Sequence, residues 1–157
     1  MLDRIKLTDL QSKVMTAEES AKFFEDGMTV GSSGFTRGGD TKVVLKAVAE
    51  RAKSENLKIT LVTGASLGHG TDAALVESGA LKKRLPFQVD TVMRKNINAG
   101  NVLFIDQHLG ETAEHILDGQ FKINLGVLEV AEILEDGSLV PTTSVGNNAV
   151  IAANADK

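Results

Sequence analysis

Glycines concentrate where short apolar runs end and helical patterns begin. Residues 30–40 hold four glycines in eleven positions. An apolar run starts before them at Met28, and from Val43 onward apolar residues recur at helical spacing. In an α/β sheet the carboxyl ends of the strands form the crevice where ligands bind, and glycine lets backbone amides approach a ligand closely. We therefore predict a ligand-facing loop at residues 30–40, between a strand and a helix.

The rest of the chain repeats this alternation of apolar runs and helical patterns. The expected strands are residues 59–62, 102–105 and 123–134. The expected helices are residues 17–25, 41–53, 71–79, 91–99 and 109–117. Residues 81–90, around Pro86, are expected to form a connector. The pattern predicts an α/β fold, a three-layer domain with a mostly parallel sheet and flanking helices.

Local signals predict where several elements begin and end. Thr16 and Glu19 have the spacing of a capping box, and Asp40 is placed to cap the helix that follows it. Asp136 and Gly137 predict a tight hairpin turn, with residues 139–140 as the returning strand. Residues 1–14 show no clear period and are expected to pack as an arm.

Composition limits the classes of partner. The chain has 157 residues, of which 42% are hydrophobic and 24% charged, as is typical of one soluble globular domain. Six Phe and no Trp or Tyr leave few rings for stacking on bases. A formal net charge of -4 gives neither phosphates nor anionic lipids a basic surface. We therefore expect neither nucleic acid nor a membrane as a partner.

Several kinds of functional site are disfavoured by the residues present. Cysteine is absent, which excludes disulfides, a thiolate nucleophile and a zinc-thiolate centre. The histidines His69, His108 and His115 lack metal-site spacing, so no metal site is predicted. Residues 34–42 lack the Gly-Lys-Ser/Thr sequence of a phosphate-binding P-loop. No signal-like segment or long apolar span is visible in the sequence, and a cytoplasmic location is expected.

A second glycine-rich junction contains a motif of serine hydrolases. Residues 64–68 read Gly-Ala-Ser-Leu-Gly and fit the G-x-S-x-G pattern that exposes a nucleophilic serine, here Ser66, after a strand. A hydrolase also needs a base and an orienting acid, for which His108 or His115 with Asp118 are the candidates. The pattern is short and the chain is small for such an enzyme. The alternative interpretation makes Ser66 a turn residue that lines the crevice.

Glu129 and Glu132 lie on or beside the long apolar run and could form a carboxylate pair, of which Glu129 is the candidate catalyst. It is either a catalytic carboxylate or a solvated edge residue with an ion-pair partner. Acidic residues near strand ends more often have the second role, which is therefore favoured.

Five sequence blocks together resemble one family. They are residues 30–36 with 40–42, 60–66, 93–100, 104–110 and 135–147. In this order they are similar to the front of the acetyl-CoA hydrolase/transferase family, the type I CoA-transferases. The resemblance extends over residues 4–157 and implies a type I CoA-transferase-like domain, apparently the N-terminal one and incomplete as an enzyme.

The resemblance implies that coenzyme A is moved between small carboxylic acids such as succinate and acetate, or that acetyl-CoA is hydrolysed. In this family a glutamate attacks the acyl thioester, and backbone amides stabilise the oxyanions. No tightly bound cofactor is implied, and the coenzyme A thioester is a substrate. The substrate-binding positions implied for this chain are Ser33, Gly34, Phe35, Thr36 and Ser66. Ser32, Ser33 and Gly34 leave room for a small acyl group, Phe35 excludes water, and Thr36 and Ser66 bind a carboxylate.

The resemblance also implies what residues 1–157 lack. Family members continue into a second domain that carries the catalytic glutamate and most coenzyme A contacts, so no catalytic residue is predicted within this chain. The isolated chain is expected to be inactive, and the full-length enzyme is expected to be a homodimer. Three interpretations stay open: a CoA-transferase N-terminal domain, a small serine hydrolase that uses Ser66, and a noncatalytic domain of the same fold.

Overall fold

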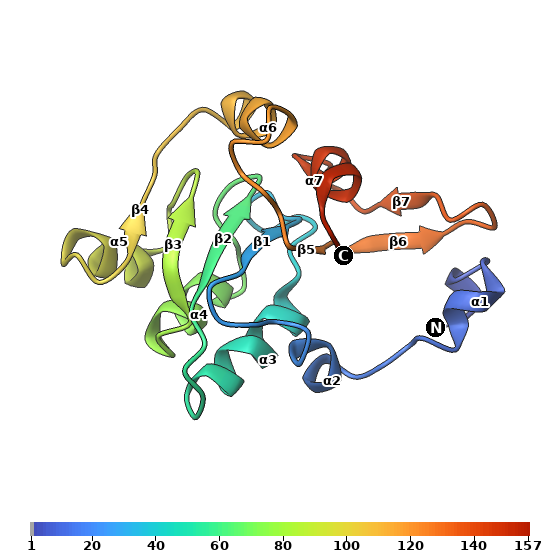
Figure 1. Ribbon diagram of the computed structural model, residues 1–157, viewed down its shortest axis with the longest axis horizontal. Coiled ribbons are helices and arrows are strands. Elements are labelled where there is room, and N and C mark those ends of the chain that lie inside the picture. The colour runs from blue at the N-terminus through green and yellow to red at the C-terminus, as the bar shows by residue number, and fades with distance from the viewer. Residues whose placement is uncertain (1) are drawn as a thin grey trace.

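The structure is a computed structural model that describes residues 2–157 (Figure 1). Its centre is a five-stranded sheet with the strand order β4-β3-β2-β1-β5. The strands are β1 (Thr29–Ser32), β2 (Ile59–Thr63), β3 (Leu81–Leu85), β4 (Leu103–Phe104) and β5 (Leu125–Val127). Every neighbouring pair is parallel, so all carboxyl ends lie along one edge. The expected mostly parallel α/β sheet is confirmed.

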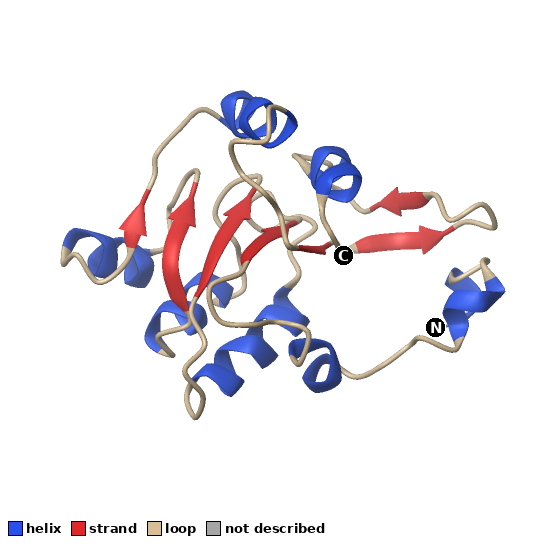
Figure 2. Cartoon of the chain, viewed as in Figure 1, coloured by secondary structure: helices blue, strands red, loops and turns tan. Residues whose placement is uncertain are grey.

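Helices cover both faces of the sheet, which gives the three expected layers (Figures 1 and 2). One face carries α2 (Ala17–Ala21), α3 (Lys42–Ala52), α4 (Thr71–Glu77) and α5 (Thr91–Asn98). The other face carries α6 (Leu109–Leu117) and α7 (Asn148–Asn154). Successive helices on the first face contact one another in chain order.

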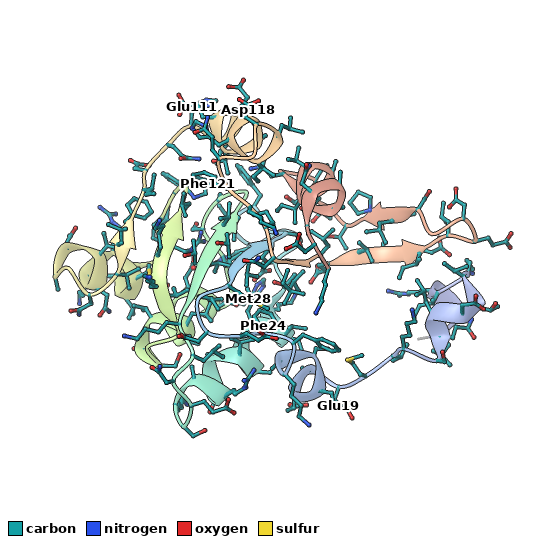
Figure 3. All side chains as sticks on the ribbon, viewed as in Figure 1. Glu19, Phe24, Met28, Glu111, Asp118 and Phe121 are labelled. Atoms are coloured by element: carbon teal, nitrogen blue, oxygen red, sulfur yellow. The ribbon has the colours of Figure 1, made fainter. Side chains whose placement is uncertain are left out.

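Two separate apolar cores hold these layers together. Under α3 to α5, the side chains of Leu45, Leu75 and Met93 pack in one cluster with Leu61 of β2. Phe24 and Met28 belong to the same core and lie between α2 and the sheet (Figure 3). The two cores lie on opposite faces of the sheet, because successive residues of a strand point to opposite faces. Leu61 of β2 faces this first core.

The second core lies under α6 and α7. Val62 of β2 and Leu85 of β3 pack there against Ile116 and Ile151. Gly31 of β1 makes this close packing possible, because a Cβ at that position would lie 2.8 Å from Cγ2 of Ile151. The helix α7 has no counterpart among the expected elements.

A hairpin and the amino-terminal segment extend away from the sheet (Figure 1). The hairpin pairs β6 (Val130–Ile133) antiparallel with β7 (Leu139–Pro141), and Gly137 in its turn has a φ of 84°. The hairpin predicted from Asp136 and Gly137 is thus confirmed. The short helices η1 (Leu2–Arg4) and α1 (Thr8–Gln11) lie beside it, where Ile5 forms a parallel bridge to Ile133.

Several expected boundaries were wrong. Residues 81–85 form the strand β3 and not a connector, because they pair in parallel with both β2 and β4. The first expected helix, residues 17–25, is shorter in the structure. It is α2, which ends at Ala21, four residues before the expected end. The apolar run of residues 123–134 divides into β5 of the sheet and β6 of the hairpin, and β6 is only half-buried.

The end signals are partly confirmed. Thr16 and Glu19 form the predicted capping box of α2, with Glu19 at its outer surface (Figure 3). The prediction that Asp40 caps the next helix was wrong. The N-cap of α3 is Thr41, which makes no side-chain cap hydrogen bond, and the carboxylate of Asp40 accepts a hydrogen bond from His69 instead.

Candidate functional site

A cavity of about 270 Å³ lies at the carboxyl ends of neighbouring strands. Thr36 and Arg37 reach it from the glycine-rich loop that follows β1. Residues 66–70, after β2, and residues 89–91, between β3 and α5, form the rest of its lining. Loops at the carboxyl ends of a parallel sheet are the usual place for a ligand site. The two glycine-rich junctions of the sequence therefore meet at one cavity.

Ser66 is the most unusual group in this lining. Its side chain is fully buried, and its Oγ has no hydrogen-bond partner within residues 2–157. Buried hydroxyls are nearly always hydrogen-bonded, and an unpaired one is costly. Ser66 therefore has a donor and an acceptor available for a ligand in the cavity.

A buried ion pair holds the turn that carries Ser66. Arg84 and Asp72 are both fully buried, with Arg84 Nε 2.9 Å from Asp72 Oδ1. Arg84 Nη2 donates to the carbonyl of Ala65 at 3.0 Å, and Asp72 Oδ2 accepts from the amide of Leu67 at 2.6 Å. Both backbone neighbours of Ser66 are thus held by charge-assisted hydrogen bonds, which are among the strongest in proteins.

Backbone strain is concentrated in the same lining. Thr36 and His69 are the two non-glycine residues with positive φ in the described part of the chain, at 58° and 54°. Gly68 lies so close to the other loop that a Cβ there would be 2.9 Å from the carbonyl oxygen of Thr36. Leu67 forms a parallel bridge to Thr36 and joins the two loops. Non-glycine residues in this region cost free energy and occur preferentially at functional sites.

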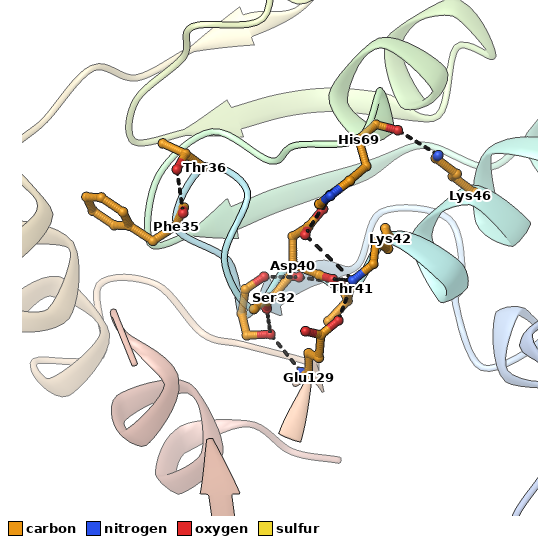
Figure 4. Close-up of polar contacts among 11 residues, drawn as sticks. Ser32, Phe35, Thr36, Asp40, Thr41, Lys42, Lys46, His69 and Glu129 are labelled. Carbon is orange, nitrogen blue, oxygen red and sulfur yellow. Dashed lines mark hydrogen bonds and ion pairs between the residues drawn. The ribbon is translucent and has the colours of Figure 1, made fainter. Parts of the chain in front are cut away.

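A network of charged side chains lies behind the glycine-rich loop (Figure 4). The carboxylate of Asp40 is fully buried, with Oδ1 3.0 Å from Nδ1 of His69 and 3.9 Å from Nζ of Lys42. Lys42 Nζ lies 2.7 Å from Oε2 of Glu129. The hydrogen bond to Glu129 raises the pKa of Lys42 above its usual value, burial opposes the rise, and the negative charges of Glu129 and Asp40 add to it. Lys46 donates to the carbonyl of His69 at 2.6 Å.

The predicted binding positions do not all face the cavity. Ser33 is buried, and its hydroxyl donates to the carbonyl of Gly39 at 2.6 Å and accepts the amide of Glu129 at 2.7 Å. Gly34 has a φ of 138°, and a Cβ there would lie 2.5 Å from a methyl group of Leu67. Both residues therefore stabilise the conformation of the loop and do not themselves line the cavity.

The other positions divide between the cavity and the surface. Thr36 and Ser66 line the cavity together, and the Thr36 hydroxyl donates to the carbonyl of Phe35 at 2.7 Å. Phe35 is 44% exposed and is not among the residues around this cavity in the part of the chain that the structure describes. The substrate-binding roles of all these residues stay predictions.

The histidines nominated for a serine hydrolase are engaged elsewhere. Nδ1 of His108 accepts the amide of Gly110 at 3.1 Å, as part of the cap of α6. The ring of His115 packs edge-to-face on Phe121. Neither histidine lines the cavity with Ser66. The geometry gives no support to a triad built on these side chains.

Two other structural observations bear on function. No group of three or more His, Asp or Glu side chains arranged for a metal ion occurs in residues 2–157. Over the same residues, no helix combines the length and the apolar character that are needed to cross a bilayer.

A match to a protein-family model identifies the family of this chain. A model described as the acetyl-CoA hydrolase/transferase N-terminal domain matches residues 2–157. The chain belongs to the acetyl-CoA hydrolase/transferase family. This membership confirms the resemblance seen in the sequence blocks, and it supports the CoA-transferase interpretation and not the serine hydrolase.

Members of the acetyl-CoA hydrolase/transferase family from several organisms are similar to the chain. It is 39% identical over 157 residues to a succinyl-CoA:acetate CoA-transferase of Clostridium kluyveri, covering 98% of this chain and 29% of that protein. It is 36% identical over 139 residues to a propanoyl-CoA:succinate CoA transferase of Escherichia coli, covering 85% and 28%. An acetyl-CoA hydrolase of Schizosaccharomyces pombe is 31% identical over 166 residues, covering 98% and 32%. The chain thus spans less than a third of the length of each of these three relatives.

Solved structures share the fold. RipA from Yersinia pestis matches with a TM-score of 0.75 and 17% identity, over 97% of this chain and 37% of that one. An acyl-CoA transferase from Escherichia coli, in a thioester complex with CoA, matches with a TM-score of 0.54 and 13% identity, over 66% of this chain and 22% of that one. At such low identities these likenesses show the α/β fold alone.

Sequence reasoning missed three features of the site. Arg37 and His69 line the cavity although neither was a binding candidate. The pair of Arg84 with Asp72 was also missed, because residues 81–90 were expected to form a connector and neither residue was a site candidate. Positions 82 and 84 lie on the same face of the strand, so strand periodicity gave no signal that separates exposed Lys82 from buried Arg84.

Proposed function

We propose that this chain is the acyl- and carboxylate-binding part of an enzyme that moves coenzyme A between small carboxylic acids or hydrolyses acetyl-CoA. The buried hydroxyl of Ser66, which has no hydrogen-bond partner in residues 2–157, carries this proposal, because Ser66 lines the cavity. Family membership supports the same assignment, since the relatives are CoA-transferases and acetyl-CoA hydrolases.

The lining of the cavity suits a small carboxylate beside a short acyl chain. Ser66 donates its hydroxyl hydrogen to a carboxylate or thioester oxygen. Arg37 adds positive charge that is available to a ligand, because its side chain has no hydrogen bond or ion pair to any residue from 2 to 157. Val89, which is 50% exposed, supplies an apolar wall for the acyl chain. The Thr36 hydroxyl becomes a second donor only after it rotates away from the carbonyl of Phe35.

The chemical step is assigned to residues outside this chain. A carboxylate nucleophile attacks the thioester carbonyl, and coenzyme A leaves as the acyl group is transferred. Glu129 is not assigned this role, because Lys42 holds its carboxylate and it does not line the cavity with Ser66. We propose that a second domain supplies the catalytic glutamate and most of the coenzyme A contacts. The homodimer stays a prediction for the full-length protein.

Acetate binding to the chain tests the assignment of the cavity. In a titration followed by nitrogen-15 NMR, acetate is expected to shift the amide signals of residues 36–37 and 66–70. Ser66→Ala is expected to weaken acetate binding roughly tenfold, since a hydrogen bond to a charged group contributes about 1.5–3 kcal/mol. Propionate serves as a second probe that also contacts the apolar wall at Val89.

Ser54→Ala is the matched control, because Ser54 is an exposed serine whose hydroxyl bonds only to the carbonyl of Arg51. This variant is expected to bind acetate as the unaltered chain does. Equal affinity of the Ser66→Ala variant and the unaltered chain, or shifts that avoid both loops, contradicts the proposed role of the cavity.

A further inference from the structure

A second cavity of about 350 Å³ lies between α5, the end of β4 and the segment that follows β3. Val89 is the one residue that lines both this cavity and the one at Ser66. The two cavities are therefore neighbours, separated by the segment of residues 87–89. The lining of the second cavity contains one cation, one anion and the buried amide of Gln88.

The buried amide belongs to Gln88, which is only 8% exposed. Its Oε1 accepts the backbone amide of Asp90 at 2.8 Å, which fixes the orientation of the side chain. Its Nε2 has no hydrogen-bond partner within residues 2–157. An amide nitrogen donates two hydrogen bonds, so Gln88 needs an acceptor that the described chain does not supply.

The two charges belong to Arg94 of α5 and Asp106 after β4. Neither side chain makes a hydrogen bond or an ion pair with any described residue, and the two are not within 4.0 Å of each other. Both side chains are exposed, so water solvates their charges when no ligand is bound. Arg94 and Asp106 thus present one unpaired positive and one unpaired negative charge to the same cavity.

Apolar side chains and the polar side chain of Asn98 complete the walls. Phe87 is 44% exposed, and Ile97 and Phe104 are half-buried. Two rings and an aliphatic side chain favour a ligand with an apolar body, which gains free energy as its surface leaves water. A ligand that fits must therefore carry an anion, a cation and an aliphatic group close together.

We infer that this cavity binds a small zwitterion, an α-amino acid with a branched aliphatic side chain. Its carboxylate lies against the guanidinium of Arg94 and accepts from Nε2 of Gln88. Its ammonium group lies against the carboxylate of Asp106, and its side chain packs on Phe87 and Phe104. A monocarboxylate leaves Asp106 facing an anion, and an amine leaves Arg94 unpaired, so each binds more weakly.

This site is separate from the proposed acyl cavity and involves no covalent step. It requires neither the second domain nor coenzyme A. Its test is therefore independent of acetate binding at Ser66, and either proposal stands if the other fails.

Three ligands that share a 3-methylbutyl group, and carry both charges or only one of them, test the inference. L-leucine, 4-methylpentanoate and 3-methylbutylamine are titrated into the nitrogen-15-labelled chain, and amide shifts are followed by NMR. L-leucine is expected to shift the amides of residues 87–89, Arg94 and Asp106. Each of the two singly charged ligands is expected to bind at least about tenfold more weakly, because it lacks one of the two ion pairs. Absence of leucine-induced shifts there, or equal affinity of leucine and 4-methylpentanoate, overturns the inference.

Two charge-removing variants test the residue assignment. Arg94→Gln and Asp106→Asn are each expected to weaken leucine binding about tenfold. The matched controls are Lys95→Gln, on the same helix outside the cavity, and Glu114→Gln, on the exposed face of α6. If a control weakens binding as much as its cavity counterpart, or if neither cavity variant weakens it, the site is not the one inferred. The ligand series on the unaltered chain decides the matter even if a variant does not fold.

Discussion

The turn that carries Ser66 depends on an ion pair that is removed from water. Arg84 has its hydrogen bonds distributed over Asp72, the hydroxyl of Thr63 and the carbonyls of Ala65 and Leu85. Such a pair contributes little net stability compared with an apolar core, but removal of one partner leaves a buried charge without compensation. At the scale of single residues, the pair therefore fixes the position of Ser66, and the loss of either partner destabilises the whole fold.

Arg84→Met is expected to lower the free energy of unfolding by about 3–5 kcal/mol, because it leaves the carboxylate of Asp72 buried and unpaired. Urea denaturation measures this change. Lys82→Met is the matched control, since Lys82 is exposed on the same strand and its loss is expected to cost less than about 0.5 kcal/mol. A similar cost for the two variants refutes the role of the buried pair.

At the scale of elements, the packing of β1 against α7 leaves no room for a side chain at Gly31. A Cβ there would lie 2.8 Å from Cγ2 of Ile151 and 3.1 Å from Cγ2 of Ile123. Both atoms belong to β-branched side chains, which have little rotamer freedom to yield. The helix α7 is therefore seated on the sheet through a glycine.

Gly31→Ala is expected to lower the free energy of unfolding by about 1–3 kcal/mol through overpacking. In a chain that already carries Ile151→Ala, which removes the contacting methyl groups, the same substitution is expected to cost markedly less. Thermal or urea denaturation of the four proteins of this double-mutant cycle gives the coupling energy. Additive effects of the two substitutions are the result that contradicts the proposed contact.

The elements that sequence patterns predicted well are those with local causes. Glycine-rich junctions, the capping box of Thr16 with Glu19 and the Asp136-Gly137 turn all depend on residues next to one another, and they are confirmed. The elements that were missed depend on distant partners. The strand β3 contains Arg84, whose burial needs Asp72 from another element, and α7 needs the glycine of β1 beneath Ile151.

The same distinction between local and long-range causes applies to the residues of the site. That Thr36 and Ser66 share a cavity was foreseeable, since both follow strands of one parallel sheet. That Asp40 binds His69 instead of capping a helix was not, because His69 lies 29 residues away in the sequence and takes a positive φ. Long-range hydrogen bonds of this kind leave no periodic signal in a single sequence.

At the scale of the whole molecule, β1 lies at the switch point of the sheet. From β1 the sheet continues through β2 to β4 on one side and to β5 on the other, so connections diverge next to its carboxyl end. Such a switch point is the preferred ligand site of open α/β sheets. Here it is occupied by the glycine-rich loop together with Lys42 and Glu129, which join the ends of β1 and β5.

The described cavity nevertheless contains no group suited to attack a thioester. Asp90 and His69, which line the cavity with Ser66, have structural partners, since Asp90 Oδ1 caps α5 by accepting the amide of Met93 and His69 Nδ1 bonds to Asp40. Ser66 lacks a base among the histidines His108 and His115, and Glu129 is held by Lys42. The relatives are more than three times longer than the matched region. These facts agree with a division of labour in which this chain binds the small carboxylate and another domain reacts.

The 157-residue chain by itself is expected to bind acetate yet show no exchange of coenzyme A between succinyl-CoA and acetate. The measurement follows labelled acetate into acetyl-CoA, with the full-length Clostridium kluyveri relative as the positive control in the same buffer. Activity at the rate of the control places the nucleophile within residues 1–157 and returns Glu129 to consideration. In that case Glu129→Gln, compared with Glu132→Gln in the neighbouring hairpin, shows whether the carboxylate next to Lys42 is the reacting group. Without such activity, the chemistry belongs to residues that this chain does not contain.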